Sequence, residues 1–158
     1  MKRRREHRLL SSEGTPSFSS RMYEVESELE TLMRRDVVTV TKNRPVRDCI
    51  DLMASSGRRR LPVADSEMRL EGIVTATDVV NYFGGGEYYN IIVNKHKLNL
   101  YSALKEPVKS IMTRGVIRAY YYEKVSEVVE KMIKFNVGGL PVVMEDGRIV
   151  GIITCLLY

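Results

Sequence analysis

Two groups of side chains in this sequence have the types and spacing needed for binding chemistry. Asp78 follows Thr75 by three residues at the expected start of a helix, and Thr77 adds a second hydroxyl. A carboxylate there can accept charge-assisted hydrogen bonds from two neighbouring hydroxyls of a sugar, and the positive end of the helix dipole keeps it ionised. The second group is the run of arginines at residues 58–60, whose guanidinium groups suit phosphate oxygens. Together they indicate recognition of a sugar phosphate.

The residue types that usually carry catalysis or hold metals are scattered along the sequence. His7 and His96 are far apart, and neither belongs to a Cys/His/Asp cluster with metal-ligand spacing. Cys49 falls on an apolar helical stripe and is expected to act as a small hydrophobic residue. The glycines at 84–86 are not followed by the Lys-Ser/Thr pair of a phosphate-binding loop. We therefore expect no enzymatic activity, no metal site and no prosthetic group.

An internal repeat organises the elements that must position these side chains. Residues 32–78 align without a gap with residues 111–157 at a constant offset of 79, and twelve of the 47 aligned positions are identical. Both copies contain a Leu-Pro-Val sequence, which begins at Leu61 and at Leu140. A module of about 50 residues buries too little surface to be comfortable alone. The two copies are therefore expected to pack together as one unit.

Each copy has the pattern of a strand, a helix, two strands and a second helix. In the first copy, β-branched residues at 37–40 predict a short strand. Apolar residues from Val46 to Ala54 recur at helical spacing, and Gly57 lies where a helix C-cap belongs. The following strands and helix are expected at residues 61–64, 70–74 and 76–83. The second copy repeats this plan, with its helical apolar stripe at Val125, Val128, Val129, Met132 and Ile133.

Charge and composition limit the classes of function. The net charge is +5, but residues 1–10 contain five Lys or Arg against one Glu, so the rest of the chain is nearly neutral. This distribution argues against a general nucleic-acid-binding surface. No apolar run reaches the roughly 18 residues that cross a bilayer, and no apolar region follows the basic start as in a secretory signal. With only two cysteines, the protein is expected to be cytoplasmic.

The repeated motifs resemble those of the CBS domain family, the small module named after cystathionine β-synthase. The first copy reads Arg60-Leu61-Pro62-Val63 and Gly72-Ile73-Val74-Thr75-Ala76-Thr77-Asp78, and the second reads Gly139-Leu140-Pro141-Val142 and Gly151-Ile152-Ile153-Thr154-Cys155-Leu156-Leu157. The resemblance covers about residues 25–158. Within the family, the sequence is similar to archaeal proteins built from several such modules and to the nucleotide-sensing gamma subunit of AMP-activated protein kinase. The resemblance implies an α+β fold in which two βαββα modules pack as a pseudo-twofold pair.

Residues 1–22 are basic and then rich in Ser, a composition that predicts a disordered basic tail. The repeat and the resemblance divide the rest of the chain into residues 23–83 as the first module, residues 84–106 as a helical connector and residues 107–158 as the second module. The sequence stops at Tyr158, before the closing helix expected of the second module.

In proteins of this family, clefts between the two modules hold AMP, ADP, ATP or S-adenosylmethionine. The resemblance places the ribose of such a ligand at Thr75, Thr77 and Asp78, its adenine at Val116 and Ile117, and its phosphates at Arg59 and Arg60. The second cleft departs from the pattern, because Leu157 replaces Asp78 and the segment Val137-Gly138-Gly139 replaces the three arginines. A weaker second site is expected at Val37, Val38 and Thr154, with Arg59 and Arg60 reaching it across the pseudo-twofold axis.

These features predict a regulatory sensor rather than a catalyst. The expected partners are an adenine nucleotide, a second copy of the chain held through helices, and an unidentified regulated protein, but not a membrane. Two alternatives remain: a ligand-free scaffold for protein interactions, and contact with nucleic acid through the basic N-terminal tail. Asp78 could also serve only as a helix-capping acid, and the arginines at 58–60 could form a solvated face.

Overall fold

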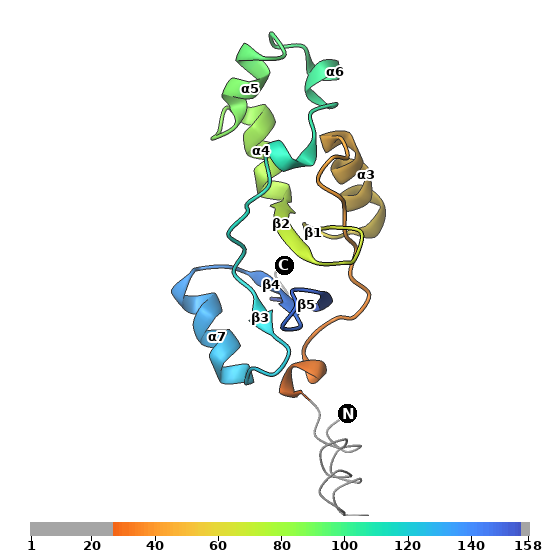
Figure 1. Cartoon of the computed structure of the whole chain (residues 1–158). Helices are drawn as coiled ribbons and strands as arrows, with labels where there is room; N and C mark the ends of the chain where they lie inside the picture. Colours follow the sequence, from red (N-terminus) through yellow and green to blue (C-terminus); the bar gives the residue numbers. More distant parts are fainter. Residues whose placement is uncertain (1–26, 156–158) are drawn as a thin grey trace, which may run out of the picture.

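The computed structural model describes residues 27–155. The expected basic tail and the replacement at Leu157 lie outside these residues. The described elements, in chain order, are η1 (Glu28–Thr31), α3 (Val46–Ser56), β1 (Arg60–Ala64), β2 (Leu70–Thr75), α4 (Ala76–Gly84), α5 (Tyr89–Asn94), α6 (Leu100–Ala103), η2 (Val108–Ser110), β3 (Ala119–Tyr120), α7 (Val125–Lys134), β4 (Gly139–Val143) and β5 (Ile149–Thr154). The two copies form two lobes, with α3, α4, β1 and β2 in one and β3, β4, β5 and α7 in the other (Figure 1). The structure is an α+β pair of equivalent modules.

The first copy forms the expected helix and hairpin, but its first strand is reduced. β1 and β2 pair antiparallel, and α3 ends at Gly57, whose φ of 73° places it in the left-handed region where glycine is favoured. The segment predicted as a strand at 37–40 contributes one parallel bridge, between Val40 and Val63. Only Val40 exchanges backbone hydrogen bonds with β1, donating to Pro62 and accepting from Ala64. Val37 and Val38 therefore stay outside the sheet.

The second copy repeats this arrangement at the same offset. β4 and β5 pair antiparallel, and β3 adds a parallel strand beside β4. Asn136, at the position equivalent to Gly57, also has a positive φ after its helix. One expectation fails on α7, because Val129 is 44% exposed and Ile133 is 75% exposed although both belong to the apolar stripe. In the first copy α4 packs against α3, and the residues equivalent to α4 begin at 155, so almost all of them lie beyond the described part of the chain.

The two copies exchange segments that are equivalent in sequence. Leu29 and Met33, near the start of the described chain, pack in the core of the second copy with Leu140 and Val142. Their equivalents at the offset of 79, Val108 and Met112, pack in the core of the first copy. Each hydrophobic core is therefore completed by residues at or just before the start of the other copy, so neither copy can fold with its full core alone.

A reciprocal pair of backbone hydrogen bonds joins the two hairpins. Leu70 N donates to Gly147 O at 2.9 Å, and its equivalent Ile149 N donates to Met68 O at 2.9 Å. Apolar side chains close the same junction, where Ala64, Val143 and Ile149 form a buried cluster. The equivalence of donor and acceptor on the two sides places the pseudo-twofold axis between the hairpin turns.

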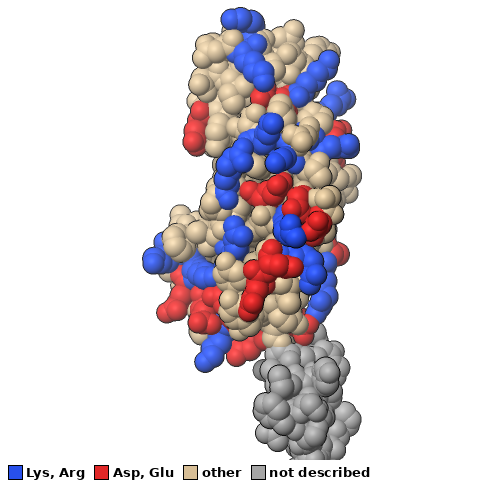
Figure 2. Space-filling view, viewed as in Figure 1, with Lys and Arg blue, Asp and Glu red and all other residues tan. Residues whose placement is uncertain are grey.

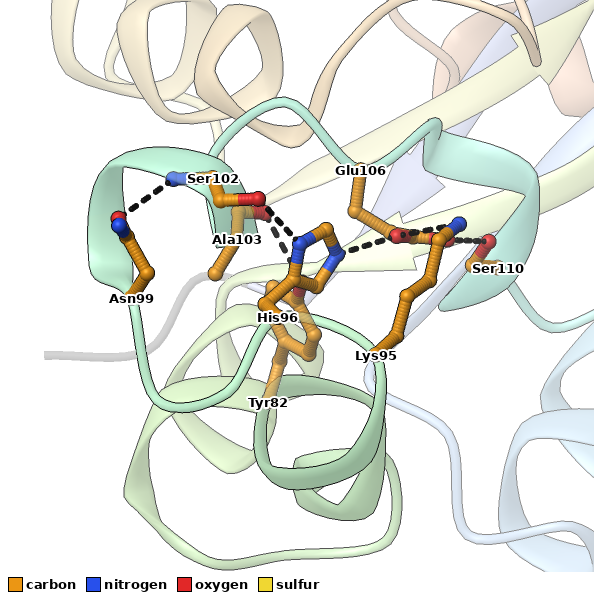
Figure 3. A network of polar contacts seen from close by, with 8 residues as sticks. All are labelled: Tyr82, Lys95, His96, Asn99, Ser102, Ala103, Glu106 and Ser110. Carbon is orange, nitrogen blue, oxygen red and sulfur yellow. Dashed lines mark hydrogen bonds and ion pairs between the residues drawn. The ribbon is translucent and has the colours of Figure 1, made fainter.

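The connector between the copies is fastened to the first one by a buried polar network (Figure 3). Glu106 is 4% exposed. Its carboxylate contacts His96 Nε2 at 2.6 Å, Lys95 Nζ at 3.0 Å and Ser110 Oγ at 2.5 Å. The backbone carbonyl of Glu106 accepts from Val46 N at 2.7 Å, which satisfies one of the free N–H groups at the start of α3. The connector therefore both caps α3 and neutralises its own buried carboxylate.

The part of the chain that the structure describes contains neither a membrane-spanning helix nor a metal-binding group of side chains. Between residues 27 and 155, no helix has the length and apolar character needed to cross a membrane. The same residues contain no group of His, Cys, Asp or Glu side chains that could hold a metal ion.

Candidate functional site

A cavity of about 440 Å³ lies between the two copies and is lined by both. This volume falls in the range of about 300–1,000 Å³ typical of small-molecule sites. The residues of the first copy that line it are Arg34, Val37, Val38, Pro62 and the segments 57–60 and 75–77. The residues of the second copy that line it are Ile152, Thr154 and Cys155. A ligand in the cavity would touch both copies at once.

The ends of the two hairpins shape the cavity in the same way. Ala76 N donates to Arg59 O at 2.8 Å, and at the equivalent position Cys155 N donates to Gly138 O at 2.8 Å. These bonds hold the residue before each hairpin against the residue that follows its last strand. Thr75 and its equivalent Thr154 are both half-buried. Each hairpin thus places a threonine at the cavity.

Arg34 and Arg58 share one carboxylate beside the cavity. Asp36 Oδ2 lies 2.8 Å from Arg58 Nη2 and 3.5 Å from Arg34 Nη2. A backbone hydrogen bond, and after it the charges of Arg34 and Arg58, hold the pKa of Asp36 below its usual value. The carboxylate therefore stays ionised and keeps both guanidinium groups near the cavity.

Arg60 extends from the start of β1 toward the other copy. A Cβ atom placed on Gly138 would lie 2.5 Å from Arg60 Nη2, and one placed on Gly139 would lie 3.3 Å from Arg60 Cδ. At the offset of 79, Gly138 and Gly139 are the equivalents of Arg59 and Arg60. The loss of the arginines from the second copy thus makes the space into which Arg60 of the first copy reaches.

Asp78 forms a capping box with Thr75 at the start of α4. Thr75 N donates to Asp78 Oδ2 at 2.8 Å, and Asp78 N donates to Thr75 Oγ1 at 3.1 Å. This arrangement satisfies two backbone N–H groups at the helix N-terminus. Asp78 is half-buried and does not line the cavity. The helix-capping role, one of the two roles that the sequence left open, is present in the structure.

The structure brings together most of the residues predicted for a binding site, but divides the two expected clefts differently. The predicted residues that line the cavity are Val37, Val38, Arg59, Arg60, Thr75, Thr77 and Thr154. Val116 and Ile117, the expected adenine slot of the first cleft, do not line it. Val116 is buried, and Ile117 packs against the core of the second copy. The cavity thus contains the set predicted for the weaker cleft together with two threonines predicted for the first one, while the expected adenine slot lies outside it.

Sequence reasoning did not find Arg34 or Cys155 as cavity residues, and it assigned the phosphates to Arg59 and Arg60 but not to Arg58. Arg58 does hold Asp36, yet it also lines the cavity. The repeat offered a signal for Cys155, because it is the equivalent of Ala76 in the segment 75–77. No sequence signal marked Arg34, since its position depends on the exchange of the N-terminal segment into the second copy.

On the face shown in Figure 2, Lys and Arg side chains interleave with Asp and Glu. The described part of the protein therefore does not present one continuous basic patch on this face. This distribution is unlike the clustered basic surface typical of a nucleic-acid-binding domain.

Comparisons with known proteins converge on one family. The sequence profile of the CBS domain matches residues 27–85 and 108–155. Protein MJ1225 of Methanocaldococcus jannaschii is 33% identical over 127 residues, which are 80% of this chain and 45% of that protein. The crystal structure of MJ1225, described as a candidate archaeal homologue of the gamma subunit of AMP-activated protein kinase, matches with a TM-score of 0.78 over 81% of this chain and 46% of that one. The chain thus spans less than half the length of this relative.

Two further solved structures carry the same fold. The CBS domain pair of protein MJ0100, in complex with 5′-methylthioadenosine and S-adenosylmethionine, is 26% identical with a TM-score of 0.62, over 82% of this chain and 90% of that one. The cytosolic domain of the Mg²⁺ channel MgtE, in complex with ATP, is 22% identical with a TM-score of 0.63, over 81% of this chain and 46% of that one. The second likeness supports the fold alone.

Proposed function

The chain belongs to the CBS domain family, and on that premise we propose that it is a regulatory module that binds an adenine nucleotide or S-adenosylmethionine between its two copies. The nucleotides that we propose as ligands are AMP, ADP and ATP. The module itself catalyses no reaction. Its role is to report the concentration of the ligand to a protein that contacts it.

The observation that carries this proposal is the cavity shared by the two copies. Val37, Val38 and Ile152 give it an apolar part that suits an adenine ring, while residues 58–60 give it a cationic end that suits phosphates. Thr154 adds a hydroxyl at the same cavity. Apolar walls with a few convergent polar groups are typical of small-molecule sites.

The mechanism follows from the contact with both copies. A ligand that touches both favours the relative orientation in which its contacts are complete. A protein that binds the module in one orientation is then coupled to the ligand, because each changes the affinity of the other by the same factor. The reciprocal hydrogen bonds between the hairpins, from Leu70 to Gly147 and from Ile149 to Met68, form the junction about which such a change would occur.

Asp78 can add a ribose contact to its capping role. The capping box uses Oδ2, so Oδ1 can accept a hydroxyl of a ligand at the edge of α4. A site of this kind would combine Asp78 with Val116 and Ile117, none of which lines the cavity. The proposal therefore allows a second ligand at that site.

Thermal unfolding tests the proposed function. A ligand that binds only the folded state stabilises the protein by about 2.7 kcal/mol at a concentration 100 times the Kd. The melting temperature of the protein rises as a result. We expect a saturable rise with at least one of AMP, ADP, ATP and S-adenosylmethionine. Thr154→Val should weaken the response if the cavity is the site, whereas Thr41→Val, a change at an exposed turn, should not. The absence of a rise with all four ligands would contradict the proposal and favour a ligand-free scaffold.

We also propose that copies of the chain associate through their helices. Val80 on α4 is 66% exposed. An exposed apolar side chain on a helix is a contact that a helix of a second copy can cover. Light scattering on the intact chain tests this association, since Val80→Glu should shift a dimer toward monomer. The regulated protein and a cytoplasmic location remain part of the same proposal.

A further inference from the structure

The cavity is lined by an unusual concentration of arginine. Arg34, Arg58, Arg59 and Arg60 all border it, and none of the described residues that line it carries a carboxylate. The nearby carboxylate of Asp36 contacts Arg34 and Arg58 but does not line the cavity. A ligand in the cavity therefore meets several cations and no opposing negative charge on the walls.

Two of these arginines are held in place before any ligand arrives. The side chain of Arg58 is only 17% exposed and pairs with Asp36 at 2.8 Å, whereas that of Arg34 is 53% exposed and lies 3.5 Å from the same carboxylate. Arg60 lies against the bare backbone of Gly138. Ordering long side chains in advance reduces the entropy lost on binding. The arrangement thus provides a preformed cationic site, in contrast to a solvated face of mobile side chains.

We propose that this cavity selects nucleoside di- and triphosphates over nucleoside monophosphates, and rejects S-adenosylmethionine and 5′-methylthioadenosine. This inference rests on the proposed function, because it names which adenine-bearing ligand the cavity takes. Each added phosphate brings negative charge and oxygens that guanidinium groups bind in a bidentate manner. S-adenosylmethionine instead brings a sulfonium and an ammonium group, which the arginines repel, and a single carboxylate in place of phosphates.

The proposal separates this chain from its relative MJ0100, whose CBS domain pair was solved with 5′-methylthioadenosine and S-adenosylmethionine. Neither of those ligands contains a phosphate. 5′-Methylthioadenosine is uncharged and would leave all four arginines without a partner. S-adenosylmethionine offers them one carboxylate beside two cationic groups, so most of their water would be removed without replacement. In this chain, the arginines at positions 34 and 58–60 would therefore favour polyphosphate ligands over uncharged or cationic ones.

Calorimetric titration of the intact chain tests the selection, using ATP, ADP, AMP, S-adenosylmethionine and 5′-methylthioadenosine without divalent cations. We expect ADP and ATP to bind at least about tenfold more tightly than AMP, since one charge-assisted hydrogen bond is worth roughly that factor. The affinity for ATP should fall steeply with added salt, whereas an uncharged ligand would show little dependence. The two sulfur-containing ligands should show no heat of binding at the cavity.

Matched variants assign the effect to the cavity. Arg34→Gln should weaken ATP binding about tenfold or more, and should weaken AMP binding less. Arg47→Gln removes the same charge from an exposed position on α3 outside the cavity, and should leave ATP binding nearly unchanged. Equal losses in the two variants would show a general effect of net charge and would overturn the inference.

The outcomes also separate this inference from the proposed function. Binding of S-adenosylmethionine or AMP as tightly as ATP would overturn the selection while leaving the adenine-ligand sensor intact. No binding of any of the five ligands would overturn the proposed function itself. Only tighter binding with added phosphate, reduced by Arg34→Gln, supports both.

Discussion

The guanidinium group of Arg60 lies where a side chain at Gly138 would have to be. A Cβ atom on Gly138 would approach Arg60 Nη2 to 2.5 Å. Arg60 belongs to the first copy and Gly138 to the second, so the contact crosses the boundary between them. The glycines at the positions equivalent to Arg59 and Arg60 therefore do more than remove two cations from the second copy. They allow one arginine of the first copy to occupy space beside the second copy.

Gly138→Ala should displace Arg60 and weaken binding of a phosphorylated ligand. The new methyl group meets the end of a flexible side chain, so Arg60 can move aside at small cost to folding stability. It can then no longer occupy its present position. We expect a several-fold loss of ATP affinity, measured by calorimetry. Gly115→Ala is the matched control, because a Cβ there meets no atom within 4 Å.

A double-mutant cycle shows whether the loss acts through Arg60. In an Arg60→Gln background, Gly138→Ala should have little further effect on ATP binding, so the two losses should not add. Fully additive losses would mean that Gly138 affects the ligand by another route.

Gly72→Ala and Gly151→Ala should destabilise the fold by similar amounts. At Gly72 a Cβ would lie 2.7 Å from Met112 Sδ and 2.9 Å from Thr113 O, and at Gly151 it would lie 2.6 Å from Met33 Sδ. The second contact at each glycine is a backbone carbonyl, which moves less readily than a side chain. We expect a cost of about 1–3 kcal/mol in each variant, measured by urea unfolding.

The control for this pair is Gly84→Ala, because a Cβ on that helical glycine has open space around it. It should be neutral or stabilising. A large cost at Gly72 with none at Gly151 would contradict the reciprocal exchange of segments between the copies.

Glu106→Gln should remove a stabilisation that depends on pH. Hydrogen bonds from Ser110, His96 and Lys95 outweigh the opposing effect of burial and lower the pKa of Glu106 from its ordinary value of 4.5. A carboxyl group whose pKa is lower in the folded state stabilises the fold above its unfolded pKa, and this contribution is lost as the pH falls through the folded pKa. We expect the variant to be about 2 kcal/mol less stable at pH 7.

The difference in unfolding free energy between the natural chain and Glu106→Gln should therefore shrink as the pH falls from 7 to below 4.5. Urea unfolding at several pH values measures it. Glu67→Gln, at an exposed turn, should show a small difference at every pH. A constant gap for Glu106→Gln would mean that its charge contributes nothing.

Tyr82→Phe tests the attachment of the connector to α4. The buried Tyr82 hydroxyl donates to Ala103 O at 2.8 Å. Burial, and after it the charge of Glu106, raises the pKa of Tyr82 to about 12, so the hydroxyl remains a donor at neutral pH. Losing this bond should cost about 1 kcal/mol and lower the melting temperature by roughly 2–4 °C.

The control, Tyr101→Phe, removes a hydroxyl from a side chain that is 80% exposed. It should leave the melting temperature unchanged. An equal effect of the two variants would show that the bond to Ala103 does not hold the connector.

The sequence predicted local structure well where one stretch of residues decides it. The helix from Val46 ends at Gly57 because that glycine takes the left-handed conformation, and the hairpin strands follow from alternating and β-branched residues. The repeat also predicted that the two copies would have equivalent elements. These features depend on interactions within a few residues.

Contacts between distant segments were harder to predict. The exchange of Leu29 and Met33 into the second copy depends on how the chain crosses the axis, and this crossing leaves no local pattern. The sequence therefore did not predict Arg34 as a cavity residue. Asp78 was recognised as a helix-start carboxylate, but spacing alone could not show that Thr75 N already engages one of its oxygens.

The most direct test of a ligand in the shared cavity uses its own cysteine. Cys155 is exposed and lines the cavity. The other cysteine, Cys49, is buried. Burial, and after it the charge of Asp48, raises the pKa of its thiol to about 12. Cys49 should therefore react slowly and serve as an internal control.

We would measure the rate of Cys155 alkylation with increasing ATP. A saturable decrease, with Cys49 unchanged, is the predicted result. A rate unaffected by saturating ATP would contradict binding in this cavity.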